Sequence, residues 1–180
     1  MVDVYEIIER YYADNKQLKD ILLEHSIQVK DRALRIAQNN KQLNLDEEFL
    51  AEAALLHDIG IVQTDAPGIS CVGTEPYIRH GILGAEILRK EGLERHARVC
   101  ERHTGTGLTL NIIEERNLPL PRKDFSPESW EEIVICYADK FYSKSKLGIE
   151  KTPEHVARSL AKHGEEGVQR FWQWKAILEP

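Results

Sequence analysis

The 180-residue chain lacks any apolar run that approaches the roughly 18 residues needed to cross a membrane. Its first fifteen residues contain no basic segment leading into an apolar stretch, and so do not resemble a signal peptide. Cysteine is scarce: Cys71, Cys100 and Cys136 are widely spaced and form neither a disulfide framework nor a C-x-x-C zinc pattern. We therefore expect a protein of a reducing cytoplasm that has no membrane interaction.

Positive charge is also limited. The 24 Lys and Arg residues are outnumbered by 30 Asp and Glu residues, which gives a formal net charge of -6. Because phosphate backbones bind basic surfaces, this balance argues against general nucleic-acid binding. A small phosphorylated substrate stays possible, since it needs only a local cationic pocket. The 42% hydrophobic and 30% charged residues are typical of a globular domain.

The sequence shows no convincing strand pair, internal repeat, low-complexity tract or linker. Apolar residues recur instead at helical spacing through most of the chain. No heptad pattern persists, so we predict an all-α fold, an irregular single-domain helical bundle over residues 1–180. The predicted helices cover about residues 2–12, 17–39, 46–60, 75–91, 94–103, 126–148 and 153–178.

Capping residues set several of these limits. Asp46 is a good N-cap, and Gly60 is predicted to stop the helix that follows it. Ser126 and Thr152 each precede a Pro-Glu pair, which is a strong signal for a helix start. Residues 105–125 are rich in Gly, Pro and charge, and we expect this loop to border a substrate pocket.

His25 lies on an apolar helix face, because Ile21 and Leu22 precede it by one turn and Val29 follows by one turn. One interpretation is a core histidine bonded to a backbone carbonyl. Asp139 has a similar position after apolar neighbours, and there the bland interpretation is a buried salt bridge. Both residues are also candidate metal ligands.

His57 and Asp58 stand in "LLHDIG", at the end of an apolar helix. They could simply be its polar C-terminal turn. However, His25, His57, Asp58 and Asp139 all lie on or at the end of apolar faces, and one shared cause explains them better than four coincidences. Imidazole nitrogen and carboxylate oxygen together are a ligand set for Fe, Mn or Zn. We therefore predict that these four residues bind one ion.

Two further histidines are candidates for a second ion that shares Asp58. His80 lies in "YIRHGILGAEIL", where Gly84 allows a close helix approach, and His103 directly precedes "TGTG". Taken alone, either would be an ordinary surface histidine. The remaining histidines have polar neighbours and are predicted to lie at the surface: His96, His155 and His163.

This ordered set resembles the HD-domain superfamily of metal-dependent phosphohydrolases. "HDIG" at residues 57–60 matches the form that names the HDIG subgroup, and "YADK" at residues 137–140 resembles the motif around the last metal-binding aspartate. His80 and His103 resemble the extra histidines of two-metal members, including the HD-GYP phosphodiesterases. The resemblance covers about residues 22–146, with the helices of residues 153–178 expected to pack on this region. Ile61 stands where many HDIG members have lysine, and the "GYP" element is absent.

The resemblance implies hydrolysis of a phosphoester, by a phosphomonoesterase or phosphodiesterase acting on a nucleotide or a related small phosphorylated metabolite. The cofactor would be one or two divalent transition-metal ions, drawn from Fe, Mn, Zn, Co and Ni. Asp58 is the predicted catalytic residue, because only its two oxygens could serve both ions. Four cations are candidates for binding substrate, although each could be ordinary surface charge: Lys144, Lys146, Arg122 and Lys123.

Two other classes stay open. Inositol oxygenase resembles this two-metal helical arrangement but activates dioxygen at a di-iron site, so oxygen uptake would separate the two enzymes. The second alternative is a non-catalytic HD domain that only senses a nucleotide. The intact ligand set argues against a degenerate domain.

Overall fold

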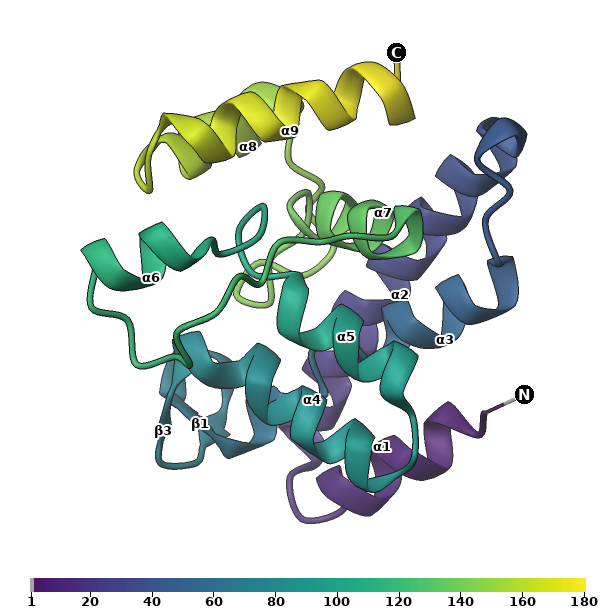
Figure 1. The fold of residues 1–180 in the computed structure, drawn as a ribbon. Coiled ribbons are helices and arrows are strands. Elements are labelled where there is room, and N and C mark those ends of the chain that lie inside the picture. Colours follow the sequence, from purple (N-terminus) through teal and green to yellow (C-terminus); the bar gives the residue numbers. More distant parts are fainter. Residues whose placement is uncertain (1) are drawn as a thin grey trace.

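The protein, described over residues 2–180 by a computed structural model, is built almost entirely from helices (Figure 1). This confirms the predicted all-α fold. Short 3-10 helices connect the longer elements: η1 (Lys41–Leu43), η2 (Ile59–Gln63), η3 (Pro67–Ile69) and η4 (Tyr77–Arg79). The α-helices are α1 (Val4–Tyr12), α2 (Lys16–Asn39), α3 (Glu47–Leu56), α4 (His80–Lys90), α5 (Glu94–Arg102), α6 (Leu110–Glu115), α7 (Trp130–Asp139), α8 (Pro153–Ala161) and α9 (Glu165–Leu178).

Side-chain caps determine where several helices begin. Asp46 and Thr152 accept backbone N–H groups at the starts of α3 and α8, as the sequence predicts. Helix α7 begins later than predicted, because Ser129 and not Ser126 is its N-cap. The Ser129 hydroxyl and the Glu132 carboxylate each accept the other residue's backbone N–H, which forms a capping box.

The structure also differs from the predicted elements in other places. Residues 64–76 form a small sheet of order β2-β1-β3, made of β1 (Thr64–Ala66), β2 (Cys71–Val72) and β3 (Glu75–Pro76). Strand β1 pairs antiparallel with β2 and parallel with β3. The helix predicted over residues 75–91 therefore begins only at His80. In addition, α6 lies within the predicted loop, and α7 ends at Asp139, before residue 148.

Two apolar clusters form the core, and α2 runs through both. One cluster joins the second half of α2 to α3, α7, α8 and α9, and it contains Val29 and Phe171. The other joins α1 and the first half of α2 to η2, α4 and α5, and it contains Ile8 and Leu22. His25 therefore lies on α2 at the boundary between the clusters. Helices α8 and α9 lie together across α7 at one end of the molecule (Figure 1).

Gly60 has a packing role that its place in the sequence does not reveal. Helix α3 already ends at Leu56, and Gly60 lies inside η2, so it is not the predicted helix stop. A Cβ atom at residue 60 would lie 2.1 Å from the His80 carbonyl oxygen and 2.3 Å from the Gly84 nitrogen. The two glycines thus let η2 approach α4 closely. This contact holds the chain after Asp58 against the start of the helix that carries His80.

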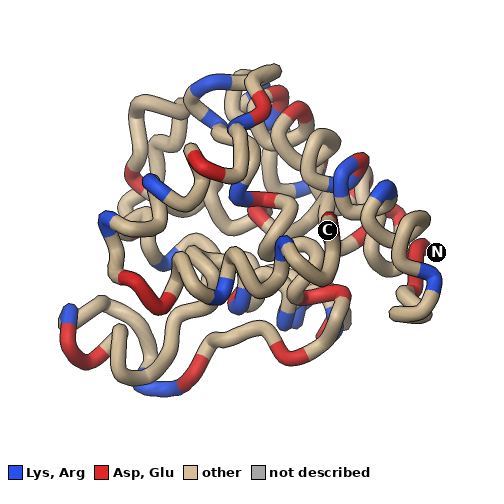
Figure 2. Tube along the Cα trace, turned by 90° about the horizontal axis from the view of Figure 1, so that it is seen from above, with Lys and Arg blue, Asp and Glu red and all other residues tan. Residues whose placement is uncertain are grey.

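Acidic and basic residues are interspersed along the whole trace (Figure 2). The view agrees with the modest net negative charge of the sequence. In the part of the chain that the structure describes, each helix is too short or too polar to span a bilayer.

Candidate metal centre

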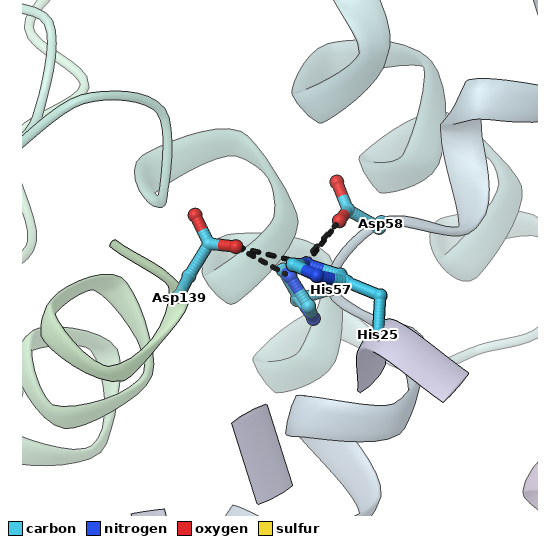
Figure 3. Close-up of side chains that lie close together, drawn as sticks. All are labelled: His25, His57, Asp58 and Asp139. Carbon is cyan, nitrogen blue, oxygen red and sulfur yellow. Dashed lines mark hydrogen bonds and ion pairs between the residues drawn. The ribbon is translucent and has the colours of Figure 1, made fainter. Parts of the chain in front are cut away.

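The structure brings together all six residues that the sequence predicts as metal ligands. They come from five segments of the chain, so the cluster is complete only when α2, α3, α4, α5 and α7 have packed together. Four of them appear in Figure 3. The six side chains are almost entirely buried: His25 on α2, His57 and Asp58 after α3, His80 at the start of α4, His103 after α5, and Asp139 at the end of α7.

One oxygen of Asp58 faces two histidines and a second carboxylate, a set that we call the Asp139 half (Figure 3). Oδ2 of Asp58 lies 3.2 Å from Nε2 of His25 and 3.1 Å from Nε2 of His57. Oδ1 of Asp139 lies 3.0 Å and 3.4 Å from the same two nitrogens. Two nitrogens and two oxygens therefore surround one point.

The other oxygen of Asp58 faces the remaining pair of histidines, a set that we call the His80 half. Oδ1 of Asp58 lies 3.5 Å from Nε2 of His80 and 3.3 Å from Nε2 of His103. The two imidazole nitrogens lie 3.0 Å apart. Asp58 thus presents one oxygen to each half, as a bridging carboxylate would.

Local hydrogen bonds orient three of the four imidazole rings. Nδ1 of each ring lies 2.7 Å from the backbone carbonyl three residues earlier in the cases of His57, His80 and His103. A carbonyl can only accept, so Nδ1 carries a proton, and in the neutral ring the lone pair of Nε2 faces the centre. Metal-ligating histidines are held in the same way. Nδ1 of His25 has no hydrogen-bond partner within residues 2–180.

The donor set fits a divalent metal ion. Donors about 2.1 Å from an ion lie about 3.0 to 3.4 Å apart at octahedral or tetrahedral angles. The nitrogen-to-oxygen distances within both halves, and the distance between the His80 and His103 nitrogens, run from 3.0 to 3.5 Å. Nε2 of His57 and Oδ1 of Asp58 are buried without a hydrogen-bond partner among the described residues. Buried polar atoms of this kind are costly unless a ligand satisfies them.

The two halves differ in electrostatic environment. Burial opposes a charge on His57, but the carboxylates of Asp58 and Asp139 outweigh it and raise the pKa of His57 to about 9. Burial and the neighbouring His103 lower the pKa of His80 to about 3. The Asp139 half therefore favours positive charge, and a divalent cation satisfies that field while keeping the rings unprotonated.

Two lysines lie against the carboxylates. The Lys144 ammonium is 2.5 Å from Oδ2 of Asp58, and the Lys140 ammonium is 2.7 Å from Oδ2 of Asp139 and donates to the His103 carbonyl. Although burial raises carboxyl pKa values, these ammonium groups help to hold the pKa of Asp58 and Asp139 well below the usual range. Lys140 was not predicted to act, although its place directly after Asp139 was the available signal.

A pocket of about 430 Å³ opens beside the Asp139 half. Asp139 and three lysines line it, with an apolar wall from the β1–η4 segment on one side and α8 on the other. Lys144 is the one predicted substrate residue in this lining. Two further lining residues, Tyr77 and Lys151, had no distinguishing signal in the sequence.

The other predicted substrate cations lie away from this pocket. Lys146 is exposed, Arg122 is 3.5 Å from Glu114, and Lys123 is 3.6 Å from Glu101. Substrate contact by these three cations stays a prediction. Arg122 and Lys123 belong to the predicted loop of residues 105–125. The first part of this loop lines a different pocket of about 560 Å³, which residues 104–118 form together with the turn between α8 and α9.

The prediction that His96 lies at the surface is wrong. Its ring is 7% exposed, Nε2 lies 3.2 Å from Oε2 of Glu52, and the ring packs edge-on against Phe49. The polar neighbours in sequence are misleading here, because the partners come from α3 and not from α5. His155 and His163 are exposed, as predicted.

The sequence matches known proteins over most of its length. The model of the HD domain family matches residues 22–144. An uncharacterized protein of Methanocaldococcus jannaschii is 34% identical over 146 residues, which are 79% of each chain. The tRNA (cytidine(56)-2'-O)-methyltransferases of Picrophilus torridus and Thermoplasma volcanium are 36% and 35% identical over 129 and 128 residues. Each of these matches covers 71% of this chain, which spans 33% of the methyltransferase.

A solved structure has the same fold. The HD domain of the L. monocytogenes phosphodiesterase PgpH superposes with a TM-score of 0.56 and 14% identity. The superposition covers 99% of this chain and 96% of the PgpH chain. At this level of identity the likeness concerns the fold alone, and it agrees with the helical bundle that the sequence predicts.

Proposed function

The chain belongs to the HD-domain family, and from that premise we propose that it hydrolyses a phosphoester of a nucleotide or related small metabolite with the help of divalent metal. One observation carries the proposal: Asp58 presents Oδ2 to the Asp139 half and Oδ1 to the His80 half. A buried carboxylate shared between two sets of imidazole donors suits a two-metal hydrolytic site. We treat residues 1–180 as one such domain.

The Asp139 half would hold one ion through His25, His57, Asp58 and Asp139, and the His80 half would hold a second through Asp58, His80 and His103. Nitrogen and oxygen donors of this kind suit Fe, Mn, Zn, Co or Ni. A bound divalent ion lowers the pKa of a coordinated water and neutralises charge on phosphoryl oxygens.

The chain's own residues prepare the site for an anionic substrate. The low pKa of Asp58 keeps it a carboxylate, which suits a bridging ligand and a hydrogen-bond acceptor. Asp58 raises the pKa of Lys144, which therefore stays an ammonium group although burial opposes the charge. Lys144 also lines the pocket, so its charge would bind the phosphate group of the substrate. Lys140 fixes the chain around His103 through the carbonyl bond.

The proposed substrate is small. A pocket of about 430 Å³ lies at the lower end of the range that encloses drug-sized ligands, roughly 300 to 1,000 Å³. A mononucleotide fits that range, whereas a folded RNA could place only one terminal or extruded group inside. The apolar wall from Ile69 and Tyr77 suits the organic part of the molecule.

The test begins with elemental analysis of protein purified without added metal. A screen then measures phosphate release from nucleoside mono- and diphosphates, cyclic nucleotides and dinucleoside polyphosphates, with and without chelator. We expect metal-dependent hydrolysis by the native protein and by His155→Ala, and its loss in Asp58→Asn. Lys144→Ala should raise KM about tenfold, since a charged hydrogen bond is worth about 1.5 kcal/mol or more.

Other outcomes would replace the proposal. Oxygen uptake with a cyclitol would favour the oxygenase class, and tight nucleotide binding with no turnover would favour a sensor. Methyl transfer to tRNA, the activity named for two relatives, is assayed in parallel with a methyl donor. If native protein holds no metal and releases no phosphate from any member of the screen, the proposed function is rejected.

A further inference from the structure

Lys151 is the one cation of the pocket beside the metal centre that forms no ion pair with a carboxylate of residues 2–180. Its ammonium donates only to the backbone carbonyls of Lys140 and Tyr142, at 3.3 and 3.5 Å. The other two lysines of the pocket form ion pairs: Lys140 with Asp139 and Lys144 with Asp58. The pocket therefore carries one positive charge that the protein itself does not balance.

The position of Lys151 is fixed by its surroundings. Its backbone N–H donates to the Phe141 carbonyl at 2.8 Å. The carboxylate next to it in sequence, Glu150, is held elsewhere: its oxygens lie 2.6 Å from Nη1 of Arg32 and 3.1 Å from the Tyr142 hydroxyl. Arg32 is itself buried. The arrangement keeps Glu150 away from Lys151 and leaves the ammonium facing the pocket.

The pocket extends from Lys151 to Asp139 of the metal centre. Asp139 lines the same cavity, and so do the small polar residues Ser143 and Ser159. Lys151 is half-buried, so water screens its charge only in part. Burial also lowers its pKa, which an anion bound beside it would reverse. A molecule with one phosphate at the metal centre would extend along the cavity towards this ammonium.

We propose that Lys151 binds a second anionic group, so that the protein prefers substrates with two phosphates, or a phosphate and another anion, over matched monophosphates. The proposal rests on the proposed function, because it places the first phosphate at the His/Asp centre. Lys151 then determines specificity: it contacts the part of the substrate that does not react. A purely structural role would instead be to cap the carbonyls that follow α7.

The probes are propylphosphonate and propane-1,3-bisphosphonate, with the two- and four-carbon pairs beside them. None of these compounds can be hydrolysed, and the members of a pair differ only in the second anion. Calorimetry measures their binding to protein saturated with manganese at constant free metal. Native protein should bind at least one bisphosphonate about tenfold more tightly than its partner, as a charged hydrogen bond predicts.

Three variants make the test specific. Lys151→Gln keeps a side-chain donor but removes the charge, and it should abolish the preference while leaving monophosphonate affinity unchanged. Lys151→Arg should retain the preference. Lys162→Gln removes an exposed lysine at the end of α8 and serves as the matched control, with no expected change.

The proposal is overturned if no bisphosphonate binds native protein more tightly than its partner, or if Lys151→Gln weakens both members of a pair equally. Equal weakening, with a lower midpoint of urea unfolding, is the result expected of a structural cap. Failure of the proposed function looks different: the preference for bisphosphonates would persist and follow Lys151, but no phosphoester would be hydrolysed.

Discussion

The two halves of the His/Asp cluster share Asp58 and yet have opposite electrostatic character. In the Asp139 half, two carboxylates face two imidazoles, and the pKa of His57 rises to about 9. In the His80 half, two imidazoles face one oxygen of the shared carboxylate, and the pKa of His80 falls to about 3. On one side of Asp58 the carboxylates outweigh the burial of the imidazole, whereas on the other side burial and the neighbouring His103 prevail.

The difference shows that ligand count alone does not describe the site. A cation in the Asp139 half gains the attraction of two carboxylates, part of which the ammonium groups of Lys144 and Lys140 offset. A cation in the His80 half must share a single carboxylate. We therefore expect the first ion to bind more tightly than the second. The following changes probe the two halves and their surroundings, and they run from the largest expected effect to the smallest.

Asp58→Asn should have the largest effect, because it alters both halves at once. Asparagine keeps the shape but loses the negative charge and one acceptor oxygen. We expect kcat/KM for a phosphoester to fall roughly a thousandfold, or about 4 kcal/mol of transition-state stabilisation, and the bound metal to fall with it. Elemental analysis and turnover are measured together. If this variant keeps native turnover and metal content, the catalytic interpretation is wrong, and His57 and Asp58 are only the polar end of a helix.

Asp139→Asn and His80→Ala should separate the halves. Loss of Asp139 removes a charge from the tighter half, so we expect little retained metal after dialysis. His80→Ala should leave about one ion per chain, with turnover lower by about 10- to 100-fold. The metal-to-protein ratio and titration with a competing chelator show which half binds its ion more tightly. Equal metal loss in the two variants would contradict the asymmetry.

Gly60→Ala should act on the His80 half through packing. A Cβ at residue 60 would meet the His80 carbonyl at 2.1 Å, and backbone must move to admit it. We expect the free energy of unfolding to fall by about 1 to 3 kcal/mol, measured by urea denaturation. Gly68→Ala is the control, since a Cβ atom at residue 68 would meet no atom within 4 Å, and its effect should stay within about 0.5 kcal/mol. Similar losses in both variants would remove the packing argument.

The joint change of Arg122 and Lys123 to alanine should have the smallest effect. Both residues follow the His80 half in sequence, and both are largely exposed and already paired with glutamates. We expect KM for an anionic substrate to rise no more than about twofold, because exposed ion pairs contribute about 0 to 1 kcal/mol. Steady-state kinetics measures this. A rise as large as that expected of Lys144→Ala would mean that substrate enters from the side of the His80 half.

Helical spacing of apolar residues predicted the fold, and His80 and His103 were added as ligands of a second ion that resemble the extra histidines of two-metal HD domains. A separate physical reason predicted the four residues of the Asp139 half. A histidine or carboxylate on an apolar helix face is costly unless it has a partner, so its position reveals a site before the partner is known. His25 and Asp139 both lie on apolar helix faces in the sequence. In the structure Nε2 of His25 lies 3.0 Å from Oδ1 of Asp139. The N-caps Asp46 and Thr152 could be predicted from the sequence, because each bonds to a backbone N–H only three residues later.

Features that depend on distant partners were not readable. In the sequence Lys151 cannot be told from a surface lysine, but in the fold its ammonium contacts the Lys140 carbonyl at the end of α7. His96 has polar sequence neighbours, but in the fold its ring contacts Glu52 of α3. The strands of residues 64–76 are two or three residues long, too short to show an alternating pattern. The start of α7 was predicted wrongly for a different reason. Ser126 and Ser129 are both possible N-caps, and the reciprocal hydrogen bonds between Ser129 and Glu132 favour Ser129.

The bonds that orient the imidazole rings also bear on the order of events during folding. The rings of His57, His80 and His103 are each fixed by a carbonyl three residues away, so their orientation is available as soon as a helix end forms. His80 and His103 are only 23 residues apart, on helices that pack as neighbours. His25 and Asp139 are 114 residues apart and meet only after a long loop closes. Because short loops close first, we expect the His80 half to assemble early in folding and the Asp139 half to form last.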